Sequence, residues 1–270
     1  MNSDSGLFEV LRDVAAVIGA IVTVGGFLVL VARTGRRLFV ATLGQQRIWY
    51  SRLKKLAPDV YISHFHGLLG EPTFKNVTGS LEEYVYVHKY FYIQAVTDAN
   101  GGVLFFSVTR RRKEFRPQVW GQEVGWSPDR STGVLQLGKF AFARLKDVGT
   151  PDGARSWLGA NRFHFSESYY FGNPGSYQTY ILGLNQAGFM DDSTKSAISL
   201  LGAEERLGAL GDAQDDDEVK AFLNREEIRE FRSKARPNLY GVASQRTGYR
   251  SLGFIETVGP DYGQVRVLRE

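Results

Sequence analysis

The stretch YVYVHKYFYIQAVTDANGGVLFFSVT, residues 84–109, decides the fold class of this 270-residue chain. Its tyrosines and β-branched residues favour extended strands, and DANGG within it is typical of a turn. The segment therefore predicts an antiparallel hairpin with strands over 84–96 and 103–109. Lys89 does not suit the apolar face of a continuous first strand. Two alternatives stay open: one long strand, or two short strands joined by a tight turn at His88 and Lys89.

Patterns outside the hairpin predict further strands and helices, and together these elements make an α+β domain. Ahead of it, residues 60–69 carry apolar side chains at helical spacing and stop at Gly70 and Pro72, as a helix does. Asn224 and Glu227 occupy capping-box positions. The other predicted elements are strands over 133–145, 162–171, 177–184, 239–243 and 264–268, helices over 194–207 and 224–235, and an acidic loop over 208–218. We expect an antiparallel sheet with a few helices to one side.

Residues 14–32 form an uncharged, mostly aliphatic run that is followed at once by Arg33, Arg36 and Arg37. As a helix this run would be roughly 28 Å long, close to the hydrocarbon thickness of a bilayer. The run predicts one N-terminal transmembrane helix with the three arginines at the membrane interface. By the positive-inside rule, the C-terminal domain then lies in the cytoplasm. A buried core helix is the alternative interpretation.

This interpretation divides the chain into three parts. They are a transmembrane anchor with its basic flank over 1–37, an amphipathic juxtamembrane segment over 38–56, and a cytosolic α+β domain over 57–270. The lipid bilayer is then the first expected partner. A second copy of the helix is another, because Gly19, Thr23 and Gly26 recur at helical spacing, although glycine is also simply common in membrane helices.

The motifs in the chain do not predict an enzyme. Residues 133–139 have the glycine spacing and lysine of a phosphate loop, but Phe140 replaces the hydroxyl that would bind magnesium. His64 and His66 would lie about 200° apart on a helix, which prevents them from sharing a metal. We therefore expect no metal, cofactor or catalytic residue, and a binding or scaffolding domain. An enzyme with dispersed catalytic residues is the alternative.

Two segments are the candidate ligand sites. Arg110, Arg111 and Arg112 end the main hairpin and form the best anion-binding candidate, although a solvated strand end would look the same. SYYFGNPGSYQTY, residues 168–180, reads as a hairpin with paired aromatics. Its alternative role is a stacking platform for a flat ring, formed by Asn173, Tyr177 and Gln178. If the two segments meet, the domain senses a phosphate-bearing small molecule, for example as a defence effector. A nucleic-acid partner is not expected.

The segment 168–180 also resembles part of a family of uncharacterised bacterial single-pass membrane proteins. The resemblance includes the anchor and the strand FYIQAVTD at 91–98, and so covers most of the chain. It implies a location in the bacterial inner membrane, with the C-terminal domain in the cytoplasm, and no known activity.

Overall fold

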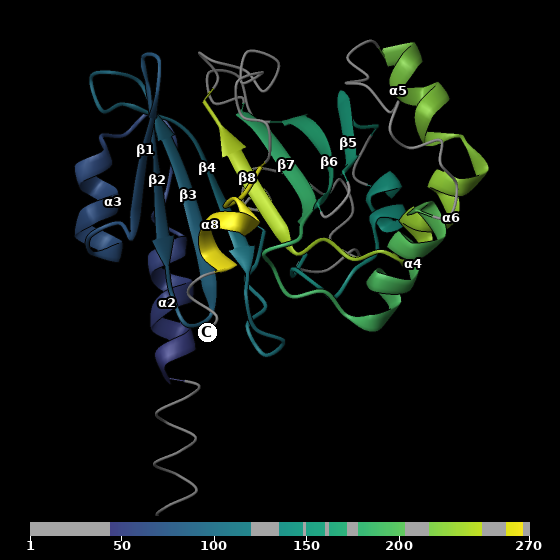
Figure 1. Ribbon diagram of the computed structural model, residues 1–270, viewed down its shortest axis with the longest axis horizontal. Coiled ribbons are helices and arrows are strands. Elements are labelled where there is room, and N and C mark those ends of the chain that lie inside the picture. Colours follow the sequence, from purple (N-terminus) through teal and green to yellow (C-terminus); the bar gives the residue numbers. More distant parts are fainter. Residues whose placement is uncertain are drawn as a thin grey trace, which may run out of the picture. The chain divides into compact units, whose positions relative to one another are not determined.

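A computed structural model describes residues 44–119, 135–147, 150–159, 162–171, 178–202, 216–244 and 258–266 (Figure 1). The chain divides into two units, Met1–Ser51 and Arg52–Glu270. Helix α2 (Gln45–Leu53) lies where the two units meet in the sequence. All other elements described below belong to the second unit.

The second unit is built on one antiparallel sheet of eight strands in the order β1-β2-β3-β4-β8-β7-β6-β5. A first meander consists of β1 (Phe74–Thr78), β2 (Leu81–Val87), β3 (Phe91–Thr97) and β4 (Val103–Arg110). A second consists of β5 (Gly153–Gly159), β6 (Arg162–Phe171) and β7 (Gln178–Asn185). The short strand β8 (Leu239–Ala243) pairs with β4 on one side and with β7 on the other. The fold is therefore α+β.

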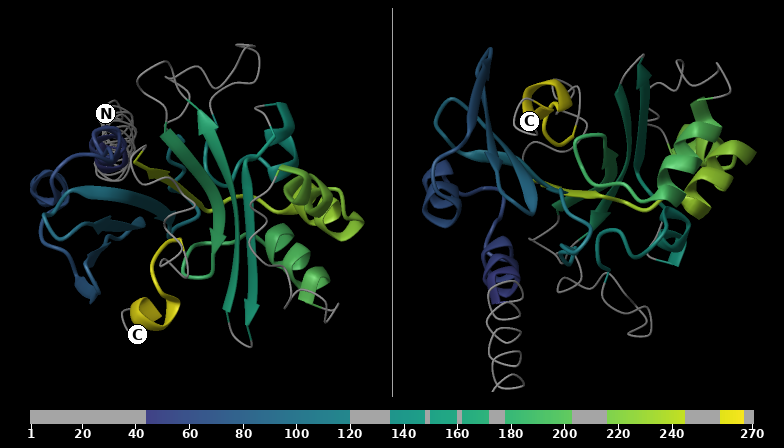
Figure 2. Two further views of the ribbon diagram at one scale, coloured as in Figure 1. Left: turned by 90° about the horizontal axis from the view of Figure 1, so that it is seen from above. Right: turned by 60° about the horizontal axis from the view of Figure 1, so that its bottom comes forward.

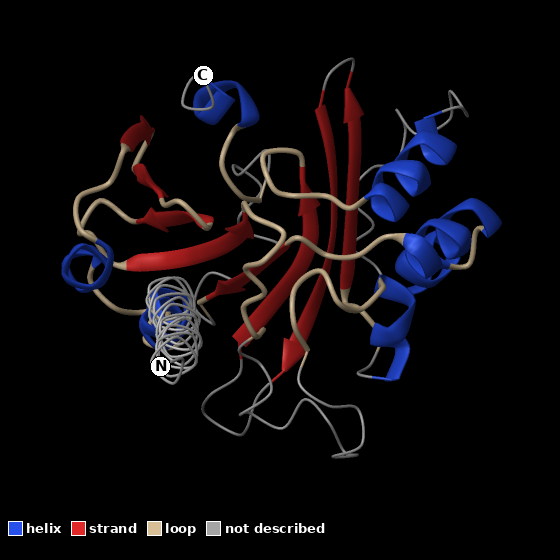
Figure 3. Cartoon of the chain, turned by 90° about the horizontal axis from the view of Figure 1, so that it is seen from below, coloured by secondary structure: helices blue, strands red, loops and turns tan. Residues whose placement is uncertain are grey.

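One face of the sheet carries the main helices. Phe65 of α3 (Ile62–Leu69) packs edge-on against Phe106 of β4, with ring centroids 5.7 Å apart. Phe231 of α6 (Glu226–Lys234) packs against Phe165 of β6 at 4.8 Å. Helices α4 (Asp192–Gly202), α5 (Asp216–Leu223) and α6 stand together beside β5 and β6 (Figure 3). The short helix α8 (Tyr262–Arg266) stands apart from them (Figure 2), because it packs through Val265 on the opposite face of the sheet.

The central hairpin consists of short strands. Strand β2 ends at Val87 and β3 begins at Phe91, and the amide of His88 donates to the carbonyl oxygen of Phe91 over 2.9 Å. This confirms the alternative with a tight turn at His88 and Lys89. The predicted helix before the hairpin is also confirmed, since α3 ends at Leu69 and Gly70 adopts a φ of 87°.

Several predicted elements are wrong. The described residues of the 133–145 strand form an isolated bridge at Gln136 and the 3-10 helix η4 (Phe142–Asp147), because Phe142 packs over Phe165 and Phe231 instead of pairing in the sheet. The predicted strand at 264–268 is helix α8 as far as it is described. Part of the predicted acidic loop is α5, and α6 starts at Glu226 without a side-chain cap from Asn224.

The predicted membrane-spanning helix requires a correction. Among the described residues, no helix is long and apolar enough to cross a bilayer. This finding contradicts the predicted fold of one transmembrane helix followed by an α+β domain, and with it the single-pass membrane assignment. The sequence features on which the prediction rested lie outside the described residues: the run 14–32, the dimer residues Gly19, Thr23 and Gly26, and the interface residues Arg33, Arg36 and Arg37.

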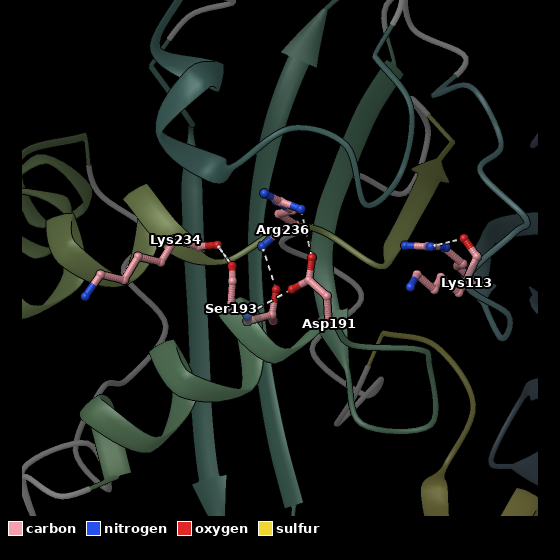
Figure 4. Close-up of polar contacts among 7 residues, drawn as sticks. Lys113, Asp191, Ser193, Lys234 and Arg236 are labelled. Atoms are coloured by element: carbon pink, nitrogen blue, oxygen red, sulfur yellow. Dashed lines mark hydrogen bonds and ion pairs between the residues drawn. The ribbon is translucent and has the colours of Figure 1, made fainter.

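Polar contacts fix the ends of α4 and α6 against each other (Figure 4). Asp191 caps α4 by accepting from the amide of Thr194 over 2.9 Å, and its other oxygen pairs with Arg236 Nη1 at 3.0 Å. The Ser193 hydroxyl donates to the carbonyl of Lys234 over 2.8 Å. Partial burial opposes ionisation of Asp191, but the hydrogen bonds from Thr194 and the Arg236 guanidinium outweigh it and lower its pKa.

A buried ion pair connects β6 to α6. Glu167 is fully buried, and its carboxylate pairs with Arg232 Nε at 2.7 Å while the Tyr169 hydroxyl donates to it over 2.6 Å. Burial raises the pKa of Glu167, and the hydrogen bonds from Arg232 and Tyr169 counter that shift. Such a pair contributes little net stability, but losing one partner leaves a desolvated charge behind.

We therefore predict that Glu167→Ala lowers the free energy of unfolding by about 3–5 kcal/mol, because Arg232 loses its buried partner. Urea denaturation measures this change. The control is Lys234→Ala, which removes the exposed ion pair with Glu230 and should cost at most about 0.5 kcal/mol. Equal effects of the two substitutions would show that the buried pair does not link the sheet to α6.

Candidate anion-binding site

The β2–β3 turn and the segment that leaves β4 lie beside each other at one end of the sheet. Strand β4 ends at Arg110, which pairs with Phe91 at the start of β3. The amide of Arg111 donates to the carbonyl of Tyr90 over 2.9 Å, so the chain leaving β4 lies beside the β2–β3 turn. The turn and the exit of β4 therefore form one surface.

Arg110 is not part of the exposed surface that the sequence led us to expect. Its side chain is 3% exposed, its Nε donates to the carbonyl of Arg112 over 3.0 Å, and its Nη2 donates to the carbonyl of Lys113 (Figure 4). Its guanidinium also lies over the Phe189 ring, 5.0 Å from the centroid. Arg110 thus shapes the loop after β4 from inside.

Gly138 makes room for the buried guanidinium. A Cβ atom at this position would lie 1.8 Å from Arg110 Nη1, and the residue has a φ of 73°. Both the contact and the backbone conformation require glycine. Gly138 was part of the phosphate-loop pattern that the sequence analysis rejected, and its role here is structural, beside Arg110.

The surface formed by the turn and the loop is mainly cationic, with exposed Glu114 as its acidic residue. Lys89, Arg112 and Lys113 are exposed, and half-buried Arg111 donates from Nη1 to the carbonyl of His88 over 3.2 Å. We call His88, Lys89, Arg111, Arg112 and Lys113 the basic end. The cations surround His88 closely enough to affect it. Burial, together with Lys89, Arg111 and nearby Arg52, lowers the pKa of His88 to about 4.

His88 adds no charge to the basic end at neutral pH. The positive potential therefore comes from the lysines and arginines around it. An anion bound there would offset their mutual repulsion and would favour protonation of His88. Arginine guanidinium groups also match the geometry of phosphate oxygens. The basic end is thus chemically suited to a phosphate group.

The second predicted segment lies elsewhere. Gln178 begins β7, and its side-chain oxygen accepts from the Tyr180 hydroxyl over 3.2 Å. Thr179 and Phe105 both pair with Ala243 of β8. Gly183 and Thr109 both pair with Leu239 of the same strand. Gln178 and Arg110 therefore lie six residue positions apart along the strands, about 20 Å.

The structure thus does not bring Gln178 to the arginines. Asn173 and Tyr177 lie outside the described residues. A stacking role for Asn173, Tyr177 and Gln178 stays a prediction, as does ligand binding by Arg111 and Arg112.

Sequence reasoning did not include His88, Lys89 and Arg52 in the site. A signal for the first two existed, because Lys89 does not suit a continuous strand. With the turn placed there, the antiparallel register, in which Phe91 pairs with Arg110, sets residues 88–90 beside 111–113. Arg52 lies far away in sequence, and no pattern in the chain relates it to His88.

A second polar cluster lies on β6. His164 Nε2 is 3.1 Å from Ser166 Oγ, and both residues are buried. Burial and nearby Arg155 lower the pKa of His164 to about 4. The contact is of the kind that activates a serine nucleophile, but Ser166 is 0% exposed, so we assign it no catalytic role. The described residues also contain no group of three metal-ligating side chains.

Comparisons with known proteins add little. No family model and no curated protein matches the chain. A crystal structure of a cysteine-rich secretory protein from Staphylococcus aureus subsp. aureus Mu50 is similar at 9% identity and a TM-score of 0.37. The match covers 76% of this chain and 49% of that one, so this chain spans about half its length. A likeness at this level carries no argument, and none of the comparisons bears on the family resemblance of residues 168–180.

The different roles of neighbouring arginines can be tested by stability. Arg110→Ala should lower the free energy of unfolding by about 2 kcal/mol, because the carbonyls of Arg112 and Lys113 lose their donors and the space of a buried side chain is left empty. The matched control, Arg112→Ala, removes an exposed side chain and should change it by at most about 0.5 kcal/mol. Urea denaturation gives both values. Equal values would contradict the structural role of Arg110.

The pKa of His88 provides a second test, by NMR titration of its imidazole. We expect a value near 4, well below the 6.5 of an exposed histidine. Because the folded pKa is the lower one, the stability that His88 contributes is complete above pH 6.5 and is lost as the pH falls toward 4. Arg111→Ala should raise the pKa, whereas Lys195→Ala on α4 should not. A pKa near 6.5 in the unmodified chain would contradict the packing described here.

Proposed function

We propose that this chain is a binding domain, and that its basic end holds a phosphate-bearing small molecule. The observation that carries the proposal is the convergence of cations from two segments, the β2–β3 turn and the loop after β4, around a neutral histidine. One arginine is buried to hold the loop, and the next two remain at the surface. This division of roles distinguishes the basic end from scattered surface arginines.

The contacts of Arg111 support the proposal. Its guanidinium lies over the Tyr92 ring at 5.2 Å, and one Nη donates to the carbonyl of His88. Both contacts fix the direction of the side chain and leave other N–H groups of the guanidinium for a ligand. Preorganised donors of this kind reduce the entropy lost on binding.

The proposal predicts that the chain binds ATP, measured by isothermal titration calorimetry at low ionic strength. Adenosine, which lacks phosphate, should not bind. Arg111→Ala combined with Arg112→Ala should weaken ATP binding at least about tenfold, because two charge-assisted contacts are lost. The binding should also weaken as salt is added.

The matched control removes two exposed lysines from helices on the other half of the sheet, Lys195→Ala and Lys220→Ala. It changes the net charge equally and should leave ATP binding unaltered. Equal weakening in both double variants would show that ATP responds to net charge alone. Binding to vesicles containing phosphatidylglycerol, without binding to ATP, would assign the surface to lipid and contradict the proposal.

A further inference from the structure

The C-terminal residues 258–266, which we call the strap, lie on the sheet face opposite α3 and α6. Side chains from the sheet hold the strap by its backbone. Gln94 accepts from the amide of Gly259 over 2.7 Å, and Asn185 Nδ2 donates to the carbonyls of Val258 and Pro260 over 2.9 and 3.3 Å. Further along, Gln264 Nε2 donates to Asn76 of β1 over 3.0 Å.

The strap fits the sheet closely at Gly259. A Cβ atom here would lie 2.7 Å from both Asn185 Nδ2 and Leu239 Cδ1, and the residue has a φ of 91°. A side chain at this position would therefore force the strap away from the sheet and also strain its backbone. This makes docking of the strap sensitive to a single methyl group.

Tyr92 connects the strap to the basic end. Its side chain is fully buried and packs in one cluster with Val265 and Tyr262 of the strap. The same ring carries the guanidinium of Arg111, 5.2 Å from its centroid. Tyr92 and Gln94 are two residues apart on β3, so their side chains lie on the same face of the strand. This one strand therefore contacts both the strap and Arg111.

We infer that the strap controls the anion site indirectly, through Tyr92 as a positioning residue. The docked strap holds the Tyr92 ring in place, and the ring holds Arg111 in the direction in which it meets a phosphate. The inference rests on the proposed function. Because two events that share a positioning residue are linked thermodynamically, docking of the strap strengthens anion binding, and a bound anion strengthens docking.

The first experiment measures ATP binding by the full chain after Gly259→Ala. We expect about fivefold weaker binding or more, the range of ordinary coupling between sites. The matched control is Gly79→Ala in the β1–β2 turn. Gly79 also has a positive φ, 62°, but a methyl group added there would meet nothing within 4 Å, so it tests the strain without the contact. Equal affinities in the two variants would overturn the inference.

The second experiment reads the strap directly. The chain contains no cysteine, so Val265→Cys, a conservative change at a position that is 0% exposed in the docked strap, creates a single thiol whose labelling by a maleimide reports undocking. Saturating ATP should slow labelling, and Gly259→Ala should speed it even if that variant binds no ATP. A labelling rate that ATP leaves unchanged in a chain that binds ATP overturns the inference alone. Absence of ATP binding in the unmodified chain instead overturns the proposed function, and the inference with it.

Discussion

The structure depends on the pairing of β8, the five-residue strand that joins two separate meanders into one sheet. Leu239 pairs with Thr109 on one side and Gly183 on the other, and all residues of β8 are buried. Gly241 allows this arrangement, because a Cβ atom there would lie 2.7 Å from the Phe105 ring. The register of β8 therefore determines which residues of the two meanders are level with each other.

The position of the basic end follows from the same pairing. The amide of Arg110 donates to the carbonyl of Asn238 just before β8, over 2.8 Å. This fixes the end of β4, and the buried Arg110 guanidinium then determines the path of the next three residues. A charge is thus used in two ways along one short segment. The buried guanidinium of Arg110 donates to backbone carbonyls, whereas the exposed guanidinium of Arg112 is available to an anion.

Local sequence patterns predicted the strands whose residue types alone indicate an extended conformation. The bounds of β6 and β8 match the sequence pattern, because β6 is rich in phenylalanine and tyrosine and β8 is a short apolar run that follows Pro237. The pattern failed at Phe142, whose alternating neighbours read as a strand while its ring covers Phe165 from outside the sheet. Nor could it place β8 between β4 and β7, because that pairing joins segments some 130 residues apart in the case of β4.

The candidate site shows the same limit. The arginine cluster was found from its composition, but composition does not distinguish buried Arg110 from exposed Arg112. That distinction requires Gly138 and Phe189, which reach Arg110 only through the tertiary fold. The sequence offered the turn at Lys89 as one of two alternatives. It did not predict the strap beside Tyr92, because residues 264–268 were expected to form a strand.

The central claim is that a phosphate-bearing ligand meets this chain where the β2–β3 turn lies beside the loop after β4. Mapping amide chemical shifts by NMR during a titration with ATP tests that location directly. The account predicts the largest changes at residues 88–90 and 111–113, with smaller changes in the strap. Changes centred on the start of β7 near Gln178, about 20 Å away along the strands, would contradict it.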